Sequence, residues 1–347
     1  MGKKEVAVLG DDLRLLLLPR RHPGHLSSIA HFHLTVFNVL RSTISMGLEK
    51  QSSNKVFGGE VTKYSFKSSV LGDLSANLNL YLPPSASSSK KVPILYFLAG
   101  LTCTEDNAAQ KGGMFEAASQ EGIALCFPDT SPRGAKIEGE DESYDFGSGA
   151  GFYINATKDP WSKHYKMYDH IVKEIPEQLK AADLPIDFSK SSVFGHSMGG
   201  HGALTLYLKG EASFKSCSAF SPICHPTACP WGEKAFKGYL AGGVEEGKQH
   251  DATELVAAAK GKKLNILLCQ ADFCPCGILL YRIDSGLGDN FYQQKQLLPE
   301  DFQEAARKSG HGEDEVNIRL QDGYDHSYFF ISTYAPEHIR WHAKFLK

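Results

Sequence analysis

Ser192-Val-Phe-Gly-His-Ser-Met-Gly-Gly-His-Gly202 is the stretch that decides the fold. It carries a G-x-S-x-G motif between a short apolar run and a helix-like segment that closes at Gly210. When a strand turns sharply into a helix, the serine takes a strained conformation and bulky neighbours would clash. A chance G-x-S-x-G in an ordinary turn is the alternative, but the strand-turn-helix context favours Ser197 as an exposed nucleophile.

Working outward from this motif, strand-like and helix-like segments alternate along the chain. Unbroken apolar runs, typical of strands buried on both faces of a parallel sheet, cover residues 92–98, 123–127, 192–194 and 264–268. Helical spacing follows at residues 167–181 and 202–210. Residues 61–66 and 76–82 alternate between apolar and polar, which predicts two antiparallel strands. The order predicts an α/β domain, with helices covering a mostly parallel sheet.

Composition excludes several function classes. The net charge of −3 provides no electrostatic footprint for nucleic acid or for an anionic membrane, and no apolar run is long enough to span a bilayer. The eight cysteines accompany a long chain with no clear signal peptide. We therefore expect reduced thiols in a cytoplasmic protein rather than a disulfide framework.

A serine hydroxyl is a weak nucleophile, so a histidine base and an orienting carboxylate must come from elsewhere in the chain. His326 lies in a loop after the strand-like residues 316–320, which is the favoured place for the base. His201 is too close to the nucleophile in sequence. His338 and His342 fall in a C-terminal amphipathic segment, where we expect packed or solvated side chains.

Two aspartates, Asp284 and Asp289, could supply the carboxylate, because both follow the strand predicted at residues 264–268. Asp322 and Asp325 flank the candidate base and are better explained as turn formers. These residues alone leave the choice between Asp284 and Asp289 open.

From about residue 53 to the C-terminus, the chain resembles the S-formylglutathione hydrolase family, also called esterase D. Several matching segments are long and rarely found in other families, which makes the resemblance specific. They are SNKVFGG (53–59), LAGLTCTEDN (98–107), PDTSPRG (128–134), FGSGAGFY (146–153), GHSMGGHG (195–202), SPIC (221–224), CPWG (229–232) and GYDHSY (323–328).

The resemblance implies the α/β-hydrolase fold and a serine hydrolase that cleaves the thioester S-formylglutathione to glutathione and formate, with general carboxylesterase activity. It implies a triad of Ser197, Asp289 and His326, and it selects Asp289 over Asp284. It implies that the oxyanion hole consists of the backbone N–H groups of Leu101 and Met198. We expect no metal and no cofactor, a small glutathione thioester as the substrate, and a homodimer.

Three further residues are candidates for the substrate pocket. Cys103 matches a cysteine near the family's active site that makes these enzymes sensitive to thiol reagents, although a small buried residue beside the loop explains it equally well. Gly149, within the glycine-rich residues 147–151, and Trp161 are expected to line the acyl and glutathione side.

The chain departs from the family pattern at two places. Residues 1–45 form an N-terminal extension that we expect to be disordered or to precede the true start at Met46, so the hydrolase domain covers residues 46–347. Residues 268–282 look like an insertion, best explained as a retained intron or a gene-model error. Its Cys269, Cys274 and Cys276 have no evident fourth partner for a metal site.

A genuine insertion would leave two alternatives for the core strand: the run before it, or residues 278–283. It could also displace Asp289. Two rival functions follow from these observations. One is a general carboxylesterase or acyltransferase on the same fold. The other is an inactive scaffold in which the insertion disrupts the triad.

Overall fold

The computed structural model describes residues 47–269 and 288–347, and the structural statements below refer to these residues. They belong to one compact unit, Met46–Lys347. The predicted extension at residues 1–45, most of the predicted insertion, and the candidate Asp284 lie outside the described residues.

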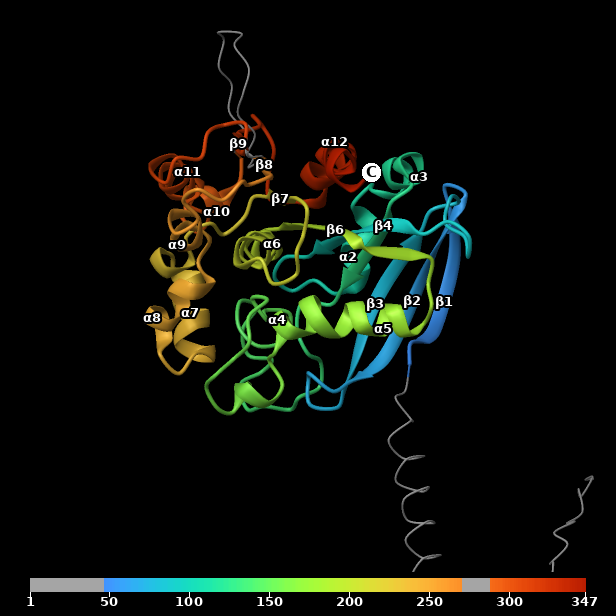
Figure 1. The fold of residues 1–347 in the computed structure, drawn as a ribbon. Helices are drawn as coiled ribbons and strands as arrows, with labels where there is room; N and C mark the ends of the chain where they lie inside the picture. Colours follow the sequence, from blue (N-terminus) through green and yellow to red (C-terminus); the bar gives the residue numbers. More distant parts are fainter. Residues whose placement is uncertain (1–46, 270–287) are drawn as a thin grey trace, which may run out of the picture. The chain divides into compact units, whose positions relative to one another are not determined.

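The described residues contain a sheet of nine strands in the order β1-β2-β3-β5-β4-β6-β7-β8-β9 (Figure 1). Pairing is antiparallel from β1 to β3 and between β3 and β5, and parallel from β5 through β4 to β9. The strands are β1 Glu49–Val56, β2 Gly59–Ser68, β3 Leu74–Leu82, β4 Val92–Leu98, β5 Ala124–Pro128, β6 Ile186–His196, β7 Cys217–Phe220, β8 Ile266–Cys269 and β9 Val316–Arg319. The mostly parallel sheet confirms the predicted fold class.

Every strand predicted from the sequence is present, and two strands were missed. β1 is polar and largely exposed, so it lacks the alternation that reveals a half-buried strand. β7 has only four residues, all buried. The open choice of core strand is also settled, because the run at residues 264–268 supplies β8, which pairs with β7 and β9.

Helices cover both faces of the sheet (Figure 1). One face carries α2 Glu105–Lys111, α3 Phe115–Glu121 and α12 Tyr328–Leu346; the other carries α4 Met167–Asp169, a π-helical turn at His170–Glu174, α5 Ile175–Ala181 and α6 Met198–Lys209. The remaining α-helices of the described residues are α7 Pro230–Tyr239, α8 Gly243–Gly247, α9 Ala252–Ala257, α10 Asn290–Gln293 and α11 Pro299–Lys308. The helix expected at residues 202–210 therefore begins four residues earlier, directly after the nucleophile.

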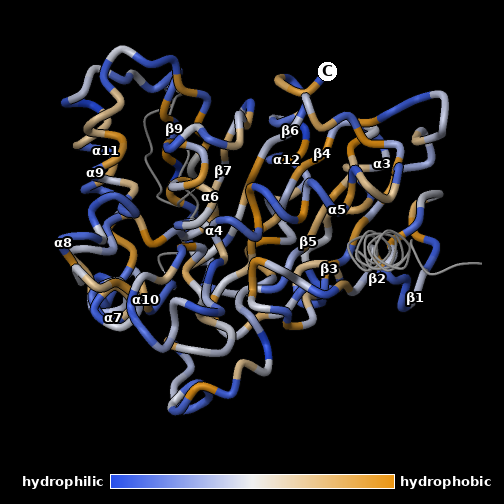
Figure 2. The backbone as a smooth tube through the Cα atoms, turned by 60° about the horizontal axis from the view of Figure 1, so that its bottom comes forward, coloured by the Kyte–Doolittle hydropathy of each residue, from blue (hydrophilic) through white to orange (hydrophobic). Residues whose placement is uncertain are grey.

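The pleat of the central strands divides the core in two. In β4, Ile94, Tyr96 and Leu98 pack with α5 and α6 on one face. Leu95 and Phe97 pack with α2, α3 and α12 on the other. Both sets are at most 1% exposed, so both faces of this strand lie in the core. Orange stretches mark hydrophobic residues in the central strands of Figure 2.

Helix α12 is joined to the sheet by a buried polar contact as well as by apolar packing. His342 Nδ1 lies 2.7 Å from Ser216 Oγ, and its Nε2 lies 2.8 Å from Ser218 Oγ. A neutral imidazole can donate to one hydroxyl and accept from the other. Burial lowers the pKa of His342 to about 3, so the ring is neutral at pH 7. Both His338 and His342 are therefore packed rather than solvated.

This histidine makes stability depend on pH. Because its folded-state pKa lies below the unfolded value of about 6.5, its contribution is complete above that pH and is lost as pH falls toward 3. We predict that the free energy of unfolding of the wild type falls more steeply than that of His342→Leu, by up to about 1.4 kcal/mol per pH unit. Urea unfolding between pH 7 and pH 4 measures this. Lys344→Ala, on the exposed side of α12, should keep the wild-type slope, and parallel curves for wild type and His342→Leu would refute the assignment.

Candidate active site

The candidate nucleophile occupies a strained turn between β6 and α6. Ser197 has φ 58° and ψ −119°, in the left-handed half of the map that side chains other than glycine rarely adopt. The flanking glycines are required by contact distances. A Cβ at Gly195 would lie 2.2 Å from the carbonyl oxygen of Gly199, and one at Gly199 would lie 2.0 Å from the carbonyl oxygen of Leu98. No larger residue fits at either place.

Hydrogen bonds from both neighbouring segments hold this turn. Ser197 N donates to Phe220 O at 2.9 Å, at the end of β7. Its carbonyl oxygen accepts from Ile223 N at 3.3 Å and from His201 N at 3.0 Å. A strained backbone persists only when its surroundings over-determine it, and these bonds supply that restraint.

Asp289 and His326, 37 residues apart in sequence, meet beside this turn. His326 Nδ1 lies 2.5 Å from Asp289 Oδ2, and the aspartate is fully buried. A carboxylate can only accept, so Nδ1 carries the proton and Nε2 is left as the basic nitrogen. The other carboxylate oxygen caps α10, accepting from Phe291 N at 2.9 Å and Tyr292 N at 3.3 Å. The two sets of bonds fix the orientation of the carboxylate.

The imidazole of His326 packs against the residue that precedes the nucleophile. Its centroid is 4.4 Å from that of His196 and 4.8 Å from that of Phe291. Its Nε2 is buried and has no hydrogen-bond partner among the described residues. The structure therefore brings the basic nitrogen to the nucleophile turn without a formed hydrogen bond to Ser197 Oγ, a contact that in such sites tightens on substrate binding.

Both candidate oxyanion donors lie next to Ser197. Met198 N–H belongs to the first turn of α6, where the helix dipole favours negative charge. Leu101 follows β4, and the loop passes so close that a Cβ at Gly100 would lie 3.2 Å from Ser197 Cβ. Neither N–H group has an acceptor among residues 47–269 and 288–347, so both are free to bind an oxyanion.

Cys103 lies near the same centre. Its Sγ is 3.7 Å from Tyr328 Oη, in the first turn of α12, and the Tyr328 ring centroid is 6.4 Å from that of His196. Burial raises the pKa of the Cys103 thiol, so the sulfur is protonated at pH 7 and is a poor nucleophile. Its position fits a residue that borders the site.

Gly149 supports the loop at residues 99–104 that carries Leu101, which we call the oxyanion loop. Trp161 lies in an aromatic cluster. Gly149 has φ +79°, its carbonyl oxygen accepts from Thr102 N at 2.9 Å, and a Cβ there would lie 2.9 Å from Thr102 Cα. Trp161 is buried, with its ring against Phe146, Tyr165 and Tyr239. Tyr239 Oη in turn accepts from Gly147 N at 2.7 Å. Trp161 thus acts on the glycine-rich loop through this cluster, and its contact with substrate stays a prediction.

Sequence reasoning missed the two rings that position the candidate base. His196 occupies the variable position of G-x-S-x-G, and Phe291 follows the aspartate by two residues. His196 belongs to the matching segment at residues 195–202, whereas Phe291 lies in none of the matching segments. Their spacing carried no sign that either ring would lie against His326, because that contact joins three distant segments.

Asp289 lies within hydrogen-bond distance of His326, and its neighbours in sequence contact distant elements. The start of the second described range is held by a distant segment, because Gly288 N donates to Tyr324 O at 3.1 Å. A few residues later, Gln296 Oε1 accepts from Trp231 N at 3.1 Å, and Leu297 O accepts from Cys224 N at 2.7 Å. These contacts, together with the hydrogen bond to His326, hold Asp289 in the candidate site.

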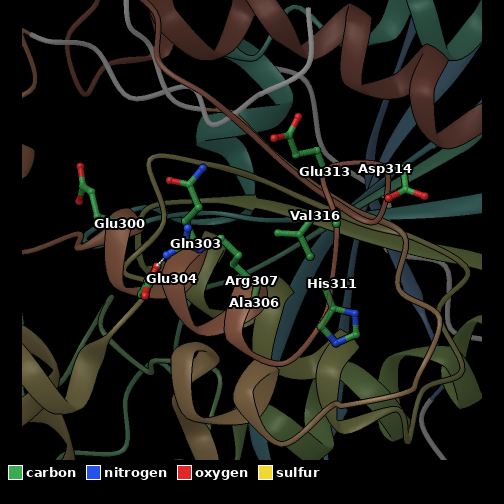
Figure 3. A pocket seen from close by; sticks show the side chains of 10 residues that line it. Glu300, Gln303, Glu304, Ala306, Arg307, His311, Glu313, Asp314 and Val316 are labelled. Carbon is green, nitrogen blue, oxygen red and sulfur yellow. Dashed lines mark hydrogen bonds and ion pairs between the residues drawn. The ribbon is translucent and has the colours of Figure 1, made fainter.

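A cavity of about 870 Å³ opens elsewhere on the domain (Figure 3). It lies between α11 and the loop that enters β9, at the amino end of that strand, whereas Ser197 follows the carboxyl end of β6. It is lined by Glu300, Gln303, Glu304, Ala306, Arg307, His311, Gly312, Glu313, Asp314 and Val316. The cavity is therefore separate from the candidate catalytic centre.

Other predicted features can be compared with the described part of the chain. Five cysteines found there are free thiols: Cys103, Cys126, Cys217, Cys224 and Cys229. Within the same residues, no three His, Cys, Asp or Glu side chains gather closely enough to hold a metal ion. Cys274 and Cys276 lie outside it. No helix in the described ranges has the length and apolar character needed to cross a membrane.

Comparison with known proteins places this geometry in a family. A family model described as "Putative esterase" matches residues 68–274. The chain is 48% identical to S-formylglutathione hydrolase of Rattus norvegicus over 87% of its length and 99% of the relative, and 46% identical to that of Arabidopsis thaliana over 88% and 100%. A solved S-formylglutathione hydrolase from Agrobacterium tumefaciens superposes with TM-score 0.75 and 37% identity, over 86% of this chain and all of that one. The chain belongs to the S-formylglutathione hydrolase family of α/β-hydrolase esterases.

Proposed function

We propose that this protein hydrolyses S-formylglutathione to glutathione and formate, using Ser197 as nucleophile, His326 as base and Asp289 as the orienting acid. The observation that carries the proposal is the Asp289–His326 hydrogen bond, which leaves the free Nε2 beside the strained turn of Ser197. The relatives that share nearly half of the sequence bear this activity in their names.

In the first half of the reaction, His326 Nε2 takes the proton from Ser197 Oγ as the oxygen attacks the thioester carbonyl carbon. The carbonyl oxygen becomes an oxyanion, which the N–H groups of Leu101 and Met198 bind. The C–S bond then breaks, glutathione leaves as the thiol with the proton held by His326, and Ser197 carries the formyl group. Asp289 holds the imidazole in the required tautomer and stabilises its transient positive charge.

In the second half, water attacks the formyl ester while His326 Nε2 accepts its proton. The same backbone N–H groups bind the second oxyanion. Collapse of this intermediate returns the proton to Ser197 Oγ and releases formate. Every group in this scheme belongs to the described residues of the chain. We propose that neither a metal nor an organic cofactor takes part.

The fold alone does not determine the substrate. A general carboxylesterase or acyltransferase would use the same triad. The kcat/KM for S-formylglutathione, compared with that for an aryl acetate, separates these activities, and the proposed function requires the thioester to be preferred. The inactive-scaffold alternative is disfavoured by the intact Asp289–His326 contact.

Replacing the nucleophile tests the proposal most simply. Ser197→Ala should lower kcat for S-formylglutathione by about 10⁴-fold or more, because no acyl-enzyme can form. Its unfolding midpoint should stay near that of the wild type, since only one oxygen is removed. Ser189→Ala, at an exposed position of β6, serves as the matched control and should retain full activity. A Ser197→Ala variant as active as the control would disprove the assignment.

Asp289 performs two functions that different substitutions separate. Asp289→Asn keeps an oxygen for the cap of α10 but presents an amide donor to His326 Nδ1, so we predict a fall in kcat of about 10³- to 10⁴-fold with little loss of stability. Asp289→Ala also removes the cap, so its free energy of unfolding should be about 1 kcal/mol lower than that of Asp289→Asn. Steady-state kinetics and urea unfolding of the pair measure both. Equal activity of Asp289→Asn and wild type would show that this carboxylate does not orient the base.

We also propose that the protein is a homodimer that acts in the cytoplasm and needs no nucleic-acid partner. Free thiols at the described cysteines agree with a reducing compartment, and the net charge of −3 disfavours nucleic acid. The dimer rests on the family resemblance. Light scattering coupled to size exclusion should give twice the mass of the chain, whereas a monomer mass at micromolar concentration would overturn the dimer.

A further inference from the structure

The segment PDTSPRG at residues 128–134 takes no part in the scheme above, yet its side chains converge on the loop that carries Leu101. It follows β5, the neighbour of β4 in the sheet, so it leaves the same edge as the oxyanion loop. We call Asp129, Thr130, Ser131 and Arg133 the oxyanion-loop clamp. Asp129, Thr130 and Ser131 are buried, and Arg133 is partly exposed.

Two members of the clamp donate to one carbonyl. Thr130 Oγ1 donates to Cys103 O at 2.5 Å, and Arg133 Nη2 donates to the same oxygen at 2.8 Å. Cys103 lies two residues after Leu101. The side chain of Arg133 is itself held by Asp129, with Nη2 2.7 Å from Oδ1 and Nε 3.0 Å from Oδ2. This two-point ion pair gives the guanidinium a defined orientation.

The third contact reaches the loop through Gly149. Ser131 Oγ accepts from Gly149 N at 2.8 Å, and Gly149 O accepts from Thr102 N at 2.9 Å. Thr102 and Cys103 therefore lie between two held peptide groups, one that contains the Thr102 N–H and one that contains the Cys103 carbonyl.

The conformation of Thr102 shows why the loop needs this support. Its φ is +65°, a left-handed value that is a genuine outlier for a β-branched residue and therefore strained. Thr102 follows Leu101 directly, so relaxation of the Thr102 backbone would reorient the Leu101–Thr102 peptide. Strain of this kind persists only where the surroundings enforce it.

We propose that Thr130 and Arg133 are positioning residues, which hold the Cys103 carbonyl so that the Leu101 N–H stays directed at the oxyanion formed on Ser197. This inference rests on the proposed function and deepens it by assigning a catalytic purpose to the segment at residues 128–134. Because the clamp acts on a group that binds the transition state, its loss should affect kcat and leave ground-state binding unchanged.

Thr130→Val and Thr130→Ser form the test pair, because valine keeps the shape of threonine without the hydroxyl and serine keeps the hydroxyl. We expect Thr130→Val to lower kcat for S-formylglutathione about 10-fold, less than the 10²- to 10³-fold typical for deletion of a donor itself. Its KM should stay within about 2-fold of the wild-type value, and Thr130→Ser should recover most of kcat. Thr333→Val is the control, because Thr333 Oγ1 also donates to a backbone carbonyl, Phe329 O, at 2.8 Å, on the exposed side of α12.

Two inhibitors separate positioning from a general loosening of the site. A trifluoromethyl ketone analogue of the thioester forms a tetrahedral adduct whose oxyanion needs the Leu101 N–H, whereas S-methylglutathione is a thioether with no thioester carbonyl and forms no such adduct. For Thr130→Val, the inhibition constant of the ketone should rise by the same factor by which kcat/KM falls, about 10-fold, and that of S-methylglutathione should not change. Equal weakening of both inhibitors, or wild-type kcat, would overturn the inference.

The test remains decisive if one variant fails to fold or the substrate assignment fails. Should Thr130→Val unfold below the assay temperature, Arg133→Gln removes the second donor to Cys103 O and carries the same expectations. Wild-type protein that hydrolyses an aryl acetate but not S-formylglutathione would contradict the proposed function. The clamp would then be judged on the aryl acetate, since its hydrolysis passes through the same oxyanion.

Discussion

The close backbone contact between the end of β4 and the start of α6 is the constraint on which the site depends. A Cβ at Gly199 would lie 2.0 Å from Leu98 O, so glycine is the only residue that permits this approach. The contact joins the turn that carries Ser197 to the loop that carries Leu101. The nucleophile and both oxyanion donors thus belong to one closely packed unit, which is what electrostatic preorganisation requires.

The acid and the base reach this unit from segments far along the chain, and each is held by a helix. Asp289 caps α10 with one oxygen and binds His326 with the other. His326 precedes α12, a helix held against the sheet by the contacts of His342 with two serines. Contacts to distant elements also hold the residues around Asp289.

Much of this arrangement could be predicted from the sequence, because buried parallel strands and a nucleophile turn leave strong local patterns. The β8 run and Ser197 are examples. β1 escaped prediction because its residues are polar on both faces, and α6 was placed too late because its glycine-rich start has low helix propensity. Asp284 and Asp289 could not be separated by spacing, and the role of Thr130 could not be seen, since both depend on contacts between distant segments.

The identity of the acylated residue tests the central claim most directly. Wild-type protein mixed with S-formylglutathione, quenched in acid within milliseconds and digested, can be mapped by mass spectrometry for a formyl group. The account predicts formyl on the hydroxyl of Ser197, appearing before free formate accumulates and disappearing as substrate is exhausted. A formyl group on the thiol of Cys103 instead, or steady turnover with no acylated peptide at any quench time, would contradict it.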